Sequence, residues 1–157
     1  MGLHVVLHEP LIPTNTGNIA RTCLATGAVL HLIHPLGFSI DDKMVRRAGL
    51  DYWQYVDVRE HESLDELYAA YPEGRFYYIE NFGTRRLVDC DFRDVHQDWF
   101  LVFGKETTGI PKTLLEGKER HILRIPMSDK VRSLNLANTV AITIFEVLRQ
   151  QGYPGLT

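Results

Sequence analysis

Residues 3–33 read LHVVLHEPLIPTNTGNIARTCLATGAVLHLI, and this stretch decides the fold class. The apolar run over residues 3–7 is followed by prolines, which predicts a short buried strand. Apolar residues near helical spacing predict a helix over residues 15–26, and Gly27 is placed to end it. A second apolar strand is expected over residues 29–33. A strand, a helix and another strand in this order indicate a βαβ unit with parallel strands.

The same alternation continues to the end of the chain. Further strands are expected over residues 53–58, 75–80, 99–103 and 122–125, and further helices over residues 41–47, 63–71 and 133–150, with a short one opening at residue 111. Strands that alternate with helices predict an α/β fold whose mostly parallel sheet is covered by helices on both faces. No internal repeat or linker interrupts the pattern, so residues 1–157 are expected to form a single domain.

The composition is that of an ordinary globular protein. Of the 157 residues, 45% are hydrophobic and 24% are charged. No apolar run approaches the ~20 residues of a membrane span, so no membrane partner is expected. Cys23 and Cys90 are far apart, and no basic and then apolar leader is visible, which predicts two reduced thiols in a cytoplasm. The histidines are scattered, and no metal site is predicted.

The net charge of −3 argues at first against a nucleic-acid partner, because binding to phosphates depends on Lys and Arg. The charge is unevenly distributed, however. Residues 51–100 hold 5 basic and 12 acidic side chains, whereas residues 1–50 hold 4 and 3, and residues 101–157 hold 8 and 5. Both ends of the chain are therefore basic, and the acidic average does not exclude an RNA partner.

The predicted last helix is apolar on more than one face. Its apolar residues are Leu134, Leu136, Ala137, Val140, Ala141, Ile142, Ile144, Phe145, Val147 and Leu148. A helix that packs on a sheet from one side needs only one apolar stripe of about 100°. A second copy of the chain is the expected partner of the extra face, and burial within a single chain is the alternative.

Several familiar motifs are missing. There is no GxGxxG and no GxSxG, and residues 104–109 lack the lysine that a P-loop has after its second glycine. Instead, three polar segments follow predicted strands, at residues 15–21, 103–111 and 125–138. In open α/β sheets, ligands bind outside the carboxyl ends of the strands, where all three segments lie. Taken singly, they also fit a turn with a helix cap at Asn15, a plain connection, and a helix cap at Ser133.

Together, these segments resemble the three signature motifs of the SPOUT RNA methyltransferases, in order and with similar spacing. The resemblance runs from the first strand to residues 152–155 and so covers essentially the whole chain. Glu9-Pro10, residues 41–43 (DDK) and residues 46–52 (RRAGLDY) are similar to the minimal, single-domain bacterial members that methylate the wobble-nucleotide ribose of tRNA. One departure is Lys105, where many members have proline, so this loop is expected to be less rigid.

The resemblance implies a trefoil knot at the C-terminal end of the α/β fold and a homodimer that uses the last helix. It also implies S-adenosylmethionine as methyl donor, S-adenosylhomocysteine as product, and no metal. The implied donor pocket falls on Ile79, Gly104, Ile125, Met127, Ser133 and Leu134. Apolar walls suit an adenine ring, and backbone groups at the glycine and at Ile125 can bind its edges.

The residue that this family is proposed to use to activate the ribose 2′-hydroxyl falls on Arg21. A guanidinium has a pKa above ~12 and seldom loses its proton, so binding the phosphate beside the target ribose is an equal alternative. The resemblance implies Arg21, Asn18, Glu106 and Asn135 as catalytic residues, with Ser133 beside them. Glu106 is expected to anchor Arg21 or the neighbouring loop, and a purely structural Arg21–Glu106 ion pair is the alternative.

RNA contacts are expected from Lys43, Arg46, Arg47, Arg85, Arg86, Lys105, Lys130 and Arg132. Nearby aromatics can stack on or clamp a splayed tRNA anticodon loop, namely Tyr52, Trp53, Phe82 and Phe92. No appended RNA-binding domain is visible, which favours compact tRNA, and no DNA partner is expected. The alternatives are an enzyme of the same superfamily that modifies another tRNA position or rRNA, and a non-catalytic RNA-binding module.

Overall fold

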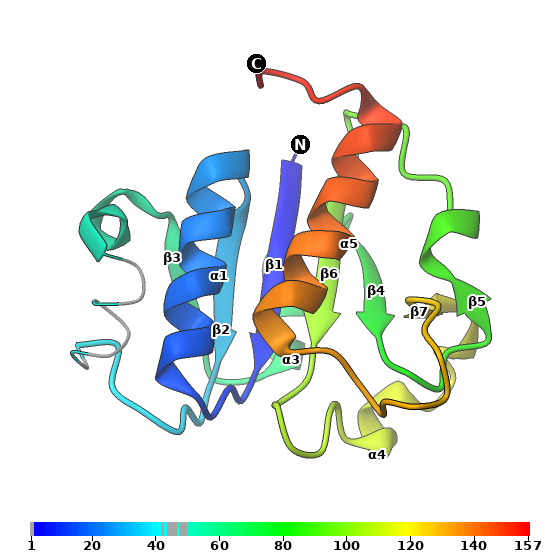
Figure 1. The fold of residues 1–157 in the computed structure, drawn as a ribbon, viewed down its shortest axis with the longest axis horizontal. Helices are drawn as coiled ribbons and strands as arrows, with labels where there is room; N and C mark the ends of the chain where they lie inside the picture. The colour runs from blue at the N-terminus through cyan, green and yellow to red at the C-terminus, as the bar shows by residue number, and fades with distance from the viewer. Residues whose placement is uncertain (1, 42, 44–46, 48–49) are drawn as a thin grey trace.

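The structure is a computed structural model that describes residues 2–41, 43, 47 and 50–157 (Figure 1). Its strands are β1 (Gly2–His8), β2 (Val29–Ile33), β3 (Val58–His61), β4 (Arg75–Ile79), β5 (Arg85–Arg86), β6 (Asp98–Phe103) and β7 (Ile122–Arg124). Its helices are α1 (Pro13–Thr26), α3 (Leu64–Ala70), α4 (Lys112–Leu115) and α5 (Leu136–Gln151), with 3₁₀ turns η1 (Leu50–Tyr55), η2 (Leu87–Asp89) and η3 (Glu119–His121). Most of the helix predicted over residues 41–47 lies outside the described residues, because residues 42 and 44–46 are not among them.

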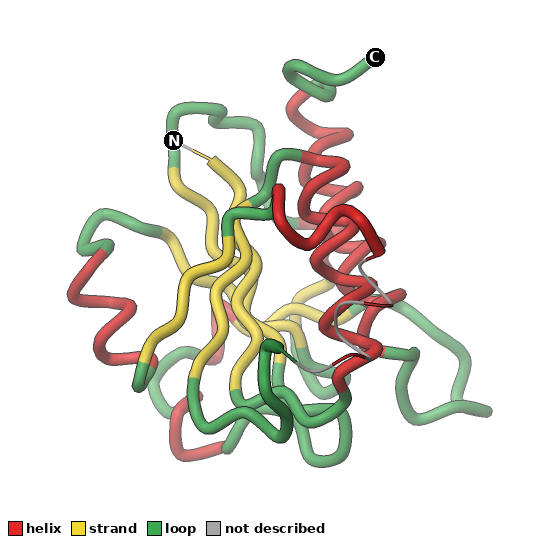
Figure 2. Tube along the Cα trace, turned by 90° about the vertical axis from the view of Figure 1, so that its left-hand side faces the viewer, coloured by secondary structure: helices red, strands yellow, loops and turns green. Residues whose placement is uncertain are grey.

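The described strands form one sheet in the order β3-β2-β1-β6-β4-β7-β5, and every neighbouring pair is parallel. Two long helices, α1 and α5, lie side by side on one face of the sheet, and the shorter α3 lies on the other (Figure 2). This arrangement confirms the predicted α/β class and its layers. The two-residue strand β5 was not predicted, because its Arg-Arg sequence carries no strand signal of its own.

Alternate residues of the central strands fill two cores, one on each face of the sheet. On the face covered by α1 and α5, Leu7 and Phe103 pack with Ile144. On the opposite face, Phe100 and Leu67 belong to a second cluster. Because β1 and β6 are buried on both faces, they are nearly continuous apolar runs, as central parallel strands are.

The two long helices begin and end differently from the sequence expectation. The N-cap of α1 is Ile12, not Asn15, and Pro13 occupies the first turn, where its missing N–H costs little. The N-cap of α5 is Asn135, so Ser133 lies outside the helix. Helix α1 ends as predicted at Gly27, which is left-handed with φ of 78°, and α5 also ends at a left-handed glycine, Gly152.

The prediction of a strand over residues 53–58 is wrong. The chain there forms the 3₁₀ turn η1, and β3 begins only at Val58, which pairs with Leu30. Trp53 of η1 packs on the core beside α1 instead of joining the sheet. Tertiary packing of the aromatic side chains therefore overrides their local preference for a strand.

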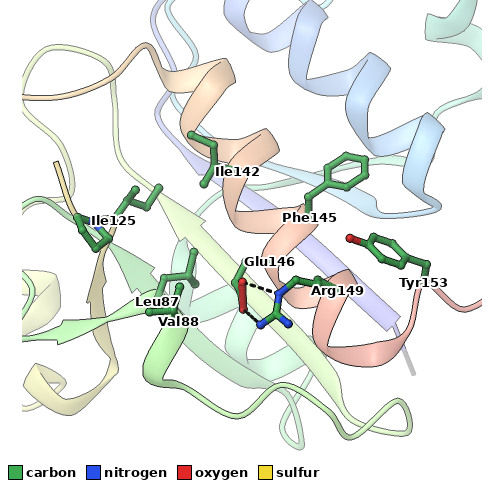
Figure 3. A pocket seen from close by; sticks show the side chains of 9 residues that line it. Leu87, Val88, Ile125, Ile142, Phe145, Glu146, Arg149 and Tyr153 are labelled. Atoms are coloured by element: carbon green, nitrogen blue, oxygen red, sulfur yellow. Dashed lines mark hydrogen bonds and ion pairs between the residues drawn. The ribbon is translucent and has the colours of Figure 1, made fainter.

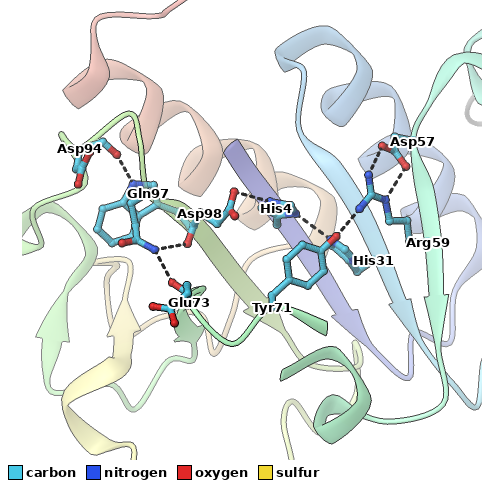
Figure 4. Close-up of polar contacts among 10 residues, drawn as sticks. His4, His31, Asp57, Arg59, Tyr71, Glu73, Asp94, Gln97 and Asp98 are labelled. Carbon is cyan, nitrogen blue, oxygen red and sulfur yellow. Dashed lines mark hydrogen bonds and ion pairs between the residues drawn. The ribbon is translucent and has the colours of Figure 1, made fainter. Parts of the chain in front are cut away.

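A row of histidines crosses the face of the sheet that α3 covers (Figure 4). His4 Nε2 lies 3.2 Å from Asp98 Oδ1, and His4 Nδ1 lies 2.9 Å from His31 Nε2. His31 Nδ1 lies 2.9 Å from His61 Nε2, and Phe100 stacks on the His4 ring. The tertiary structure thus joins three histidines that are far apart in sequence into one hydrogen-bonded row.

This row predicts acid-sensitive stability. Burial lowers the pKa of His31 from 6.5 to about 3, and it also lowers the pKa values of His4 and His61. Below pH 6.5 the unfolded chain binds a proton at His31 that the folded chain does not. The contribution of neutral His31 to the free energy of unfolding should therefore be complete above pH 6.5. As the pH is lowered from 6.5 towards 3, the free energy of unfolding should fall by about 1.4 kcal/mol per pH unit for His31 alone.

The measurement is urea unfolding of the wild type, His31→Gln and the exposed control His96→Gln at a series of pH values. We expect a shallower pH dependence for His31→Gln and an unchanged one for His96→Gln. A slope that does not differ between wild type and His31→Gln would contradict the prediction, even if the variant is less stable at every pH.

Candidate active site

The parallel sheet brings the three polar segments to one edge. β6 lies between β1 and β4, and β7 lies beside β4. Leu7 pairs with Phe103, and Ile79 pairs with both Phe103 and Leu123, so the carboxyl ends of four strands are adjacent. From this edge the chain continues into α1, into the loop over residues 104–111 and into the loop before α5 (Figure 1). This edge of the sheet is therefore the candidate active site.

Glu106 fastens the loop after β6 to the start of α1. Its Oε1 accepts a hydrogen bond from the backbone N–H of Leu11 at 2.9 Å, and its Oε2 accepts one from that of Ile12 at 2.7 Å. The carboxylate thus lies at the N-terminus of α1, where a negative charge is favoured. Of the two expected roles, Glu106 anchors the neighbouring loop. Among the described residues, Arg21 is not one of its partners.

Asn15 connects all three segments. Its side-chain N–H donates to Glu106 Oε2 at 3.3 Å, and its Oδ1 accepts from Asn135 Nδ2 at 3.2 Å. Asn135 Oδ1 in turn accepts from the backbone N–H groups of Ala137 and Asn138 at the start of α5. The chain of hydrogen bonds therefore runs from α5 through two asparagines to the loop after β6.

Sequence reasoning missed Asn15, which was expected only to turn the chain or cap a helix. Asn15 is 8% exposed, and its amide satisfies Glu106 and Asn135 rather than the backbone of its own helix. The available signal was its place in the first motif at the carboxyl end of a buried strand. A buried amide needs partners, so such a place predicts a role in a network.

Arg21 lies further along α1 on the surface. Its guanidinium carbon lies 5.2 Å from the centre of the Tyr52 ring on η1, a cation–π contact that orients it without neutralising it. Asn18 is also exposed, and its backbone carbonyl accepts from the Thr22 hydroxyl at 3.3 Å. Among the described contacts, none joins the Asn18 side chain to Glu106 or Asn135. The catalytic roles of Asn18 and Arg21 stay predictions.

The residues of the implied donor pocket converge at the same edge. Ile79 and Gly104 are buried at the ends of β4 and β6, and Ile125 and Met127 are half-buried after β7. Ser133 and Leu134 are exposed in the loop before α5. This loop is held to the loop after β4, because Asn81 Nδ2 donates to the Arg132 carbonyl at 3.0 Å. Apolar side chains beside tightly turning backbone suit an adenine ring and its polar edges, so the residues present fit the donor.

The loop after β6 is folded back on itself. The backbone N–H of Gly109 donates to the Lys105 carbonyl at 2.9 Å, which closes the loop. A Cβ on Gly104 would lie 2.1 Å from the backbone carbon of Gly109, so only glycine fits there. Lys105 is therefore held in a closed loop, and its Nζ lies 3.2 Å from Glu9 Oε1.

The other expected RNA-binding side chains differ in how available they are. Arg85 donates to the Arg120 carbonyl at 2.8 Å, and Arg86 forms an exposed ion pair with Asp89. The side chains of Lys43, Arg47, Lys130 and Arg132 are exposed. Arg46 lies outside the described residues. Lys130 and Arg132 lie on the loop before α5, at the candidate site, and the binding of these cations to RNA stays a prediction. Phe92, one of the aromatics expected to stack on RNA, is buried in the core and is not available for such a contact.

The outward face of α5 carries apolar side chains that a single chain leaves exposed. Ile142 and Phe145 are 42% and 46% exposed, whereas Val140, Ile144 and Val147 on the opposite face are buried. A shallow pocket of about 310 Å³ lies beside this face. Its lining includes Phe145, Val88 and Tyr153 (Figure 3). The helix is thus apolar on two faces, as its sequence indicates.

Neither a metal centre nor a membrane span is found among the described residues. No group of three or more His, Cys, Asp or Glu side chains in this part of the chain is arranged to hold a metal ion. None of the helices formed by these residues has both the length and the apolar character needed to cross a membrane.

Comparisons with known proteins agree on a family. Residues 2–145 match the family described as the SpoU rRNA Methylase family. A relative from Bacillus subtilis (strain 168), named "Putative tRNA (cytidine(34)-2'-O)-methyltransferase", is 56% identical over 99% of this chain and 98% of its own. A solved structure described as "Structural insights into the 2-OH methylation of C/U34 on tRNA" is 43% identical, with a TM-score of 0.89 over 96% of each chain.

A further similar structure contains the methyl donor. The SpoU methyltransferase AviRb from Streptomyces viridochromogenes, solved in complex with the cofactor AdoMet, is 25% identical with a TM-score of 0.78. The likeness covers 96% of this chain and 60% of that chain. A protein of the same fold therefore binds this methyl donor.

Proposed function

This chain belongs to the SpoU rRNA methylase family, and we propose that it is an S-adenosylmethionine-dependent tRNA methyltransferase acting on the 2′-hydroxyl of the ribose at position 34, cytidine or uridine. Relatives of nearly the same length carry that activity in their names, and a solved structure of 43% identity concerns the same nucleotide. The trefoil knot implied by the family stays a prediction.

One observation carries the proposal, namely the hydrogen-bonded chain from Asn135 through Asn15 to Glu106. It joins the three motif segments, which are separated by up to 120 positions in sequence. An arrangement of this kind holds the loops at the sheet edge in one geometry before substrate arrives. Such preorganisation is what transfer between two bound molecules requires, because alignment of the reacting atoms can supply several kcal/mol.

When bound, S-adenosylmethionine would supply a sulfonium-activated methyl group to the ribose 2′-oxygen, with the hydroxyl proton passing to water and S-adenosylhomocysteine as the leaving group. The residues that would hold it are Ile79, Gly104, Ile125, Met127, Ser133 and Leu134. Their apolar side chains would exclude water from the adenine ring, and loop backbone groups would bind its polar edge. No metal is needed for this chemistry, because the sulfonium itself activates the methyl group.

Arg21 would bind the RNA rather than act as a base. Its exposed guanidinium contacts the Tyr52 ring. A guanidinium offers hydrogen-bond donors but no acceptor for a proton. A guanidinium matches the paired oxygens of a phosphate, so Arg21 can fix the phosphate beside the target ribose and thereby aim the 2′-hydroxyl. Lys43, Arg47, Lys130 and Arg132 would contact the rest of the anticodon loop. We propose no DNA partner and no membrane partner, and we place this tRNA modification in the cytoplasm.

The exposed face of α5 supports a homodimer. In one chain, Ile142, Phe145 and Tyr153 are each more than 40% exposed and lie beside a shallow apolar pocket (Figure 3). A second copy that brings the same face would cover these side chains in an isologous contact.

The dimer can be tested with Phe145→Glu. A carboxylate in a contact between two copies would be costly to bury, so the variant should sediment as a monomer while the wild type sediments as a dimer. Val95→Glu is the matched control, because Val95 is 43% exposed on the loop before β6 and does not line the pocket beside α5. A monomeric wild type, or dissociation by both substitutions, would contradict this interface.

The function is tested by incubating the purified protein with S-adenosylmethionine and total tRNA from a strain lacking its gene, and mapping the methylated ribose by mass spectrometry. We expect one new 2′-O-methyl group, at position 34. Methylation at another tRNA position, or of rRNA only, would favour the alternative enzyme. Donor binding without transfer to any RNA would favour a non-catalytic binding module.

A further inference from the structure

Glu80 lies at the candidate site but belongs to none of the three motifs. It directly follows β4, and its backbone N–H donates to the Leu123 carbonyl of β7 at 3.0 Å. Its Oε1 accepts a hydrogen bond of 2.6 Å from the backbone N–H of Ile110, at the far end of the loop after β6. One residue therefore links the carboxyl ends of β4, β6 and β7.

Burial of the Glu80 carboxylate at this position disfavours its charged form. The side chain is half-buried, and burial raises its pKa, while the Ile110 N–H opposes that rise. Among the described residues, no Lys, Arg or His forms an ion pair with it. Burying a carboxylate without a cationic partner costs free energy, and the hydrogen bond from the Ile110 N–H offsets part of that cost.

The Gly109–Ile110 peptide is held from two sides. On one side, the backbone of Gly104 is so close that a Cβ there would lie 2.2 Å from Ile110 N. On the other side, a Cβ on Gly109 would lie 2.5 Å from Glu80 Oε1. Gly109 also has φ of +73°, a conformation that other residues rarely adopt. The Gly109–Ile110 peptide is thus packed between the Glu80 carboxylate and the buried end of β6.

We infer that Glu80 is a positioning residue that sets the shape of the donor pocket by holding the Gly109–Ile110 peptide against Gly104. The inference rests on the proposed function for the identity of the donor. Gly104 and Ile79 belong to the implied pocket. Glu80 directly follows Ile79 in the chain, and its carboxylate holds the Ile110 N–H that lies against Gly104. Losing the bond to Ile110 frees the loop end, and the pocket must then be reassembled each time the donor binds.

The first test compares Glu80→Ala and Glu80→Gln by calorimetric titration with S-adenosylmethionine and with S-adenosylhomocysteine. We expect Glu80→Ala to weaken both by about 10-fold, the effect of losing one well-placed hydrogen bond. Glu80→Gln should bind both nearly as well as the wild type, because its amide oxygen can accept from Ile110. In turnover, KM for the donor should rise in Glu80→Ala while kcat at saturating donor stays within about 2-fold.

A second measurement does not depend on the donor. Hydrogen exchange at the Ile110 amide should be faster in Glu80→Ala than in the wild type and restored in Glu80→Gln. If the Ile110 amide exchanges faster in Glu80→Ala but the wild type does not bind the donor, the proposed function is contradicted and the positioning of the loop by Glu80 is still supported. Unchanged exchange in Glu80→Ala, or a loss in Glu80→Gln as large as that in Glu80→Ala, would overturn the inference.

The Gly109→Ala variant tests the contact between Gly109 and Glu80 independently, and Gly117→Ala is its matched control. Gly117 has φ of +78°, and a Cβ added to it would meet no atom within 4 Å, so Gly117→Ala measures the cost of the left-handed conformation alone. We expect Gly109→Ala to weaken donor binding in the wild-type background and to weaken it less in the Glu80→Ala background, where the steric conflict is gone. Equal losses in both backgrounds would overturn the contact between the two residues.

Discussion

Replacing Arg21 with alanine should lower turnover by at least about 100-fold, the usual effect of removing one charged group that orients or stabilises the reacting centre. The dissociation constant of S-adenosylmethionine should change by less than about 2-fold, because no contact of Arg21 with a donor-pocket residue is among those described. The physical reason is the position of Arg21, which is exposed on α1 and, among the described contacts, is held by the Tyr52 ring. Single-turnover methylation of tRNA, combined with calorimetric titration of the donor, measures both quantities.

Two further variants make this result interpretable. Arg93→Ala is the matched control, because Arg93 is also an exposed arginine but is paired with Asp91 on a loop away from the site. It should leave turnover unchanged. Arg21→Lys should recover only part of the activity if the planar fork binds a phosphate, since an ammonium cannot replace it. A large loss of donor affinity in Arg21→Ala would instead place this residue in the donor pocket.

Replacing Glu106 with alanine should lower turnover by about 100-fold and the free energy of unfolding by about 2 kcal/mol. Its carboxylate accepts from the backbone N–H groups of Leu11 and Ile12 and from the Asn15 side chain, so all three donors lose their partner. The start of α1 is then no longer fastened to the loop after β6. Single-turnover methylation and urea unfolding measure the two effects.

The controls separate the site from general destabilisation. Glu116→Ala removes an exposed carboxylate at the end of α4 and should change neither quantity. Glu106→Gln keeps one acceptor oxygen and should recover most of the stability, but less of the activity if the negative charge favours the α1 N-terminus. Full activity in Glu106→Ala would show that the hydrogen-bonded chain through Asn15 does not organise catalysis.

Local sequence features predicted the elements that depend on local physics. The apolar runs that became β1, β2 and β6 are buried on both faces, and such runs read as strands without any knowledge of their partners. Gly27 ends α1 because glycine adopts the left-handed conformation without strain. Ser63 caps α3 by accepting from the Glu66 N–H, as the capping-box spacing indicates.

The errors occur where a distant partner competes with a local preference. Asn15 does not cap its own helix because its amide binds Glu106 and Asn135. Trp53 lies in a 3₁₀ turn because the core beside α1 takes up its side chain. Neither competing contact leaves a trace in the neighbouring residues, so no local rule can detect it.

By itself, the sequence determined the α/β class, the order of the main elements, the three polar segments and the family. The class and the elements follow from periodicity and turn residues, which act over a few residues at a time, whereas the family is indicated by the resemblance of the three segments to its motifs. The tertiary structure alone decided that Asn15 connects the segments, that Glu80 holds the loop after β6, and that three scattered histidines form one row. Each of these contacts joins residues at least 27 positions apart, and only the pairing of parallel strands brings such residues together.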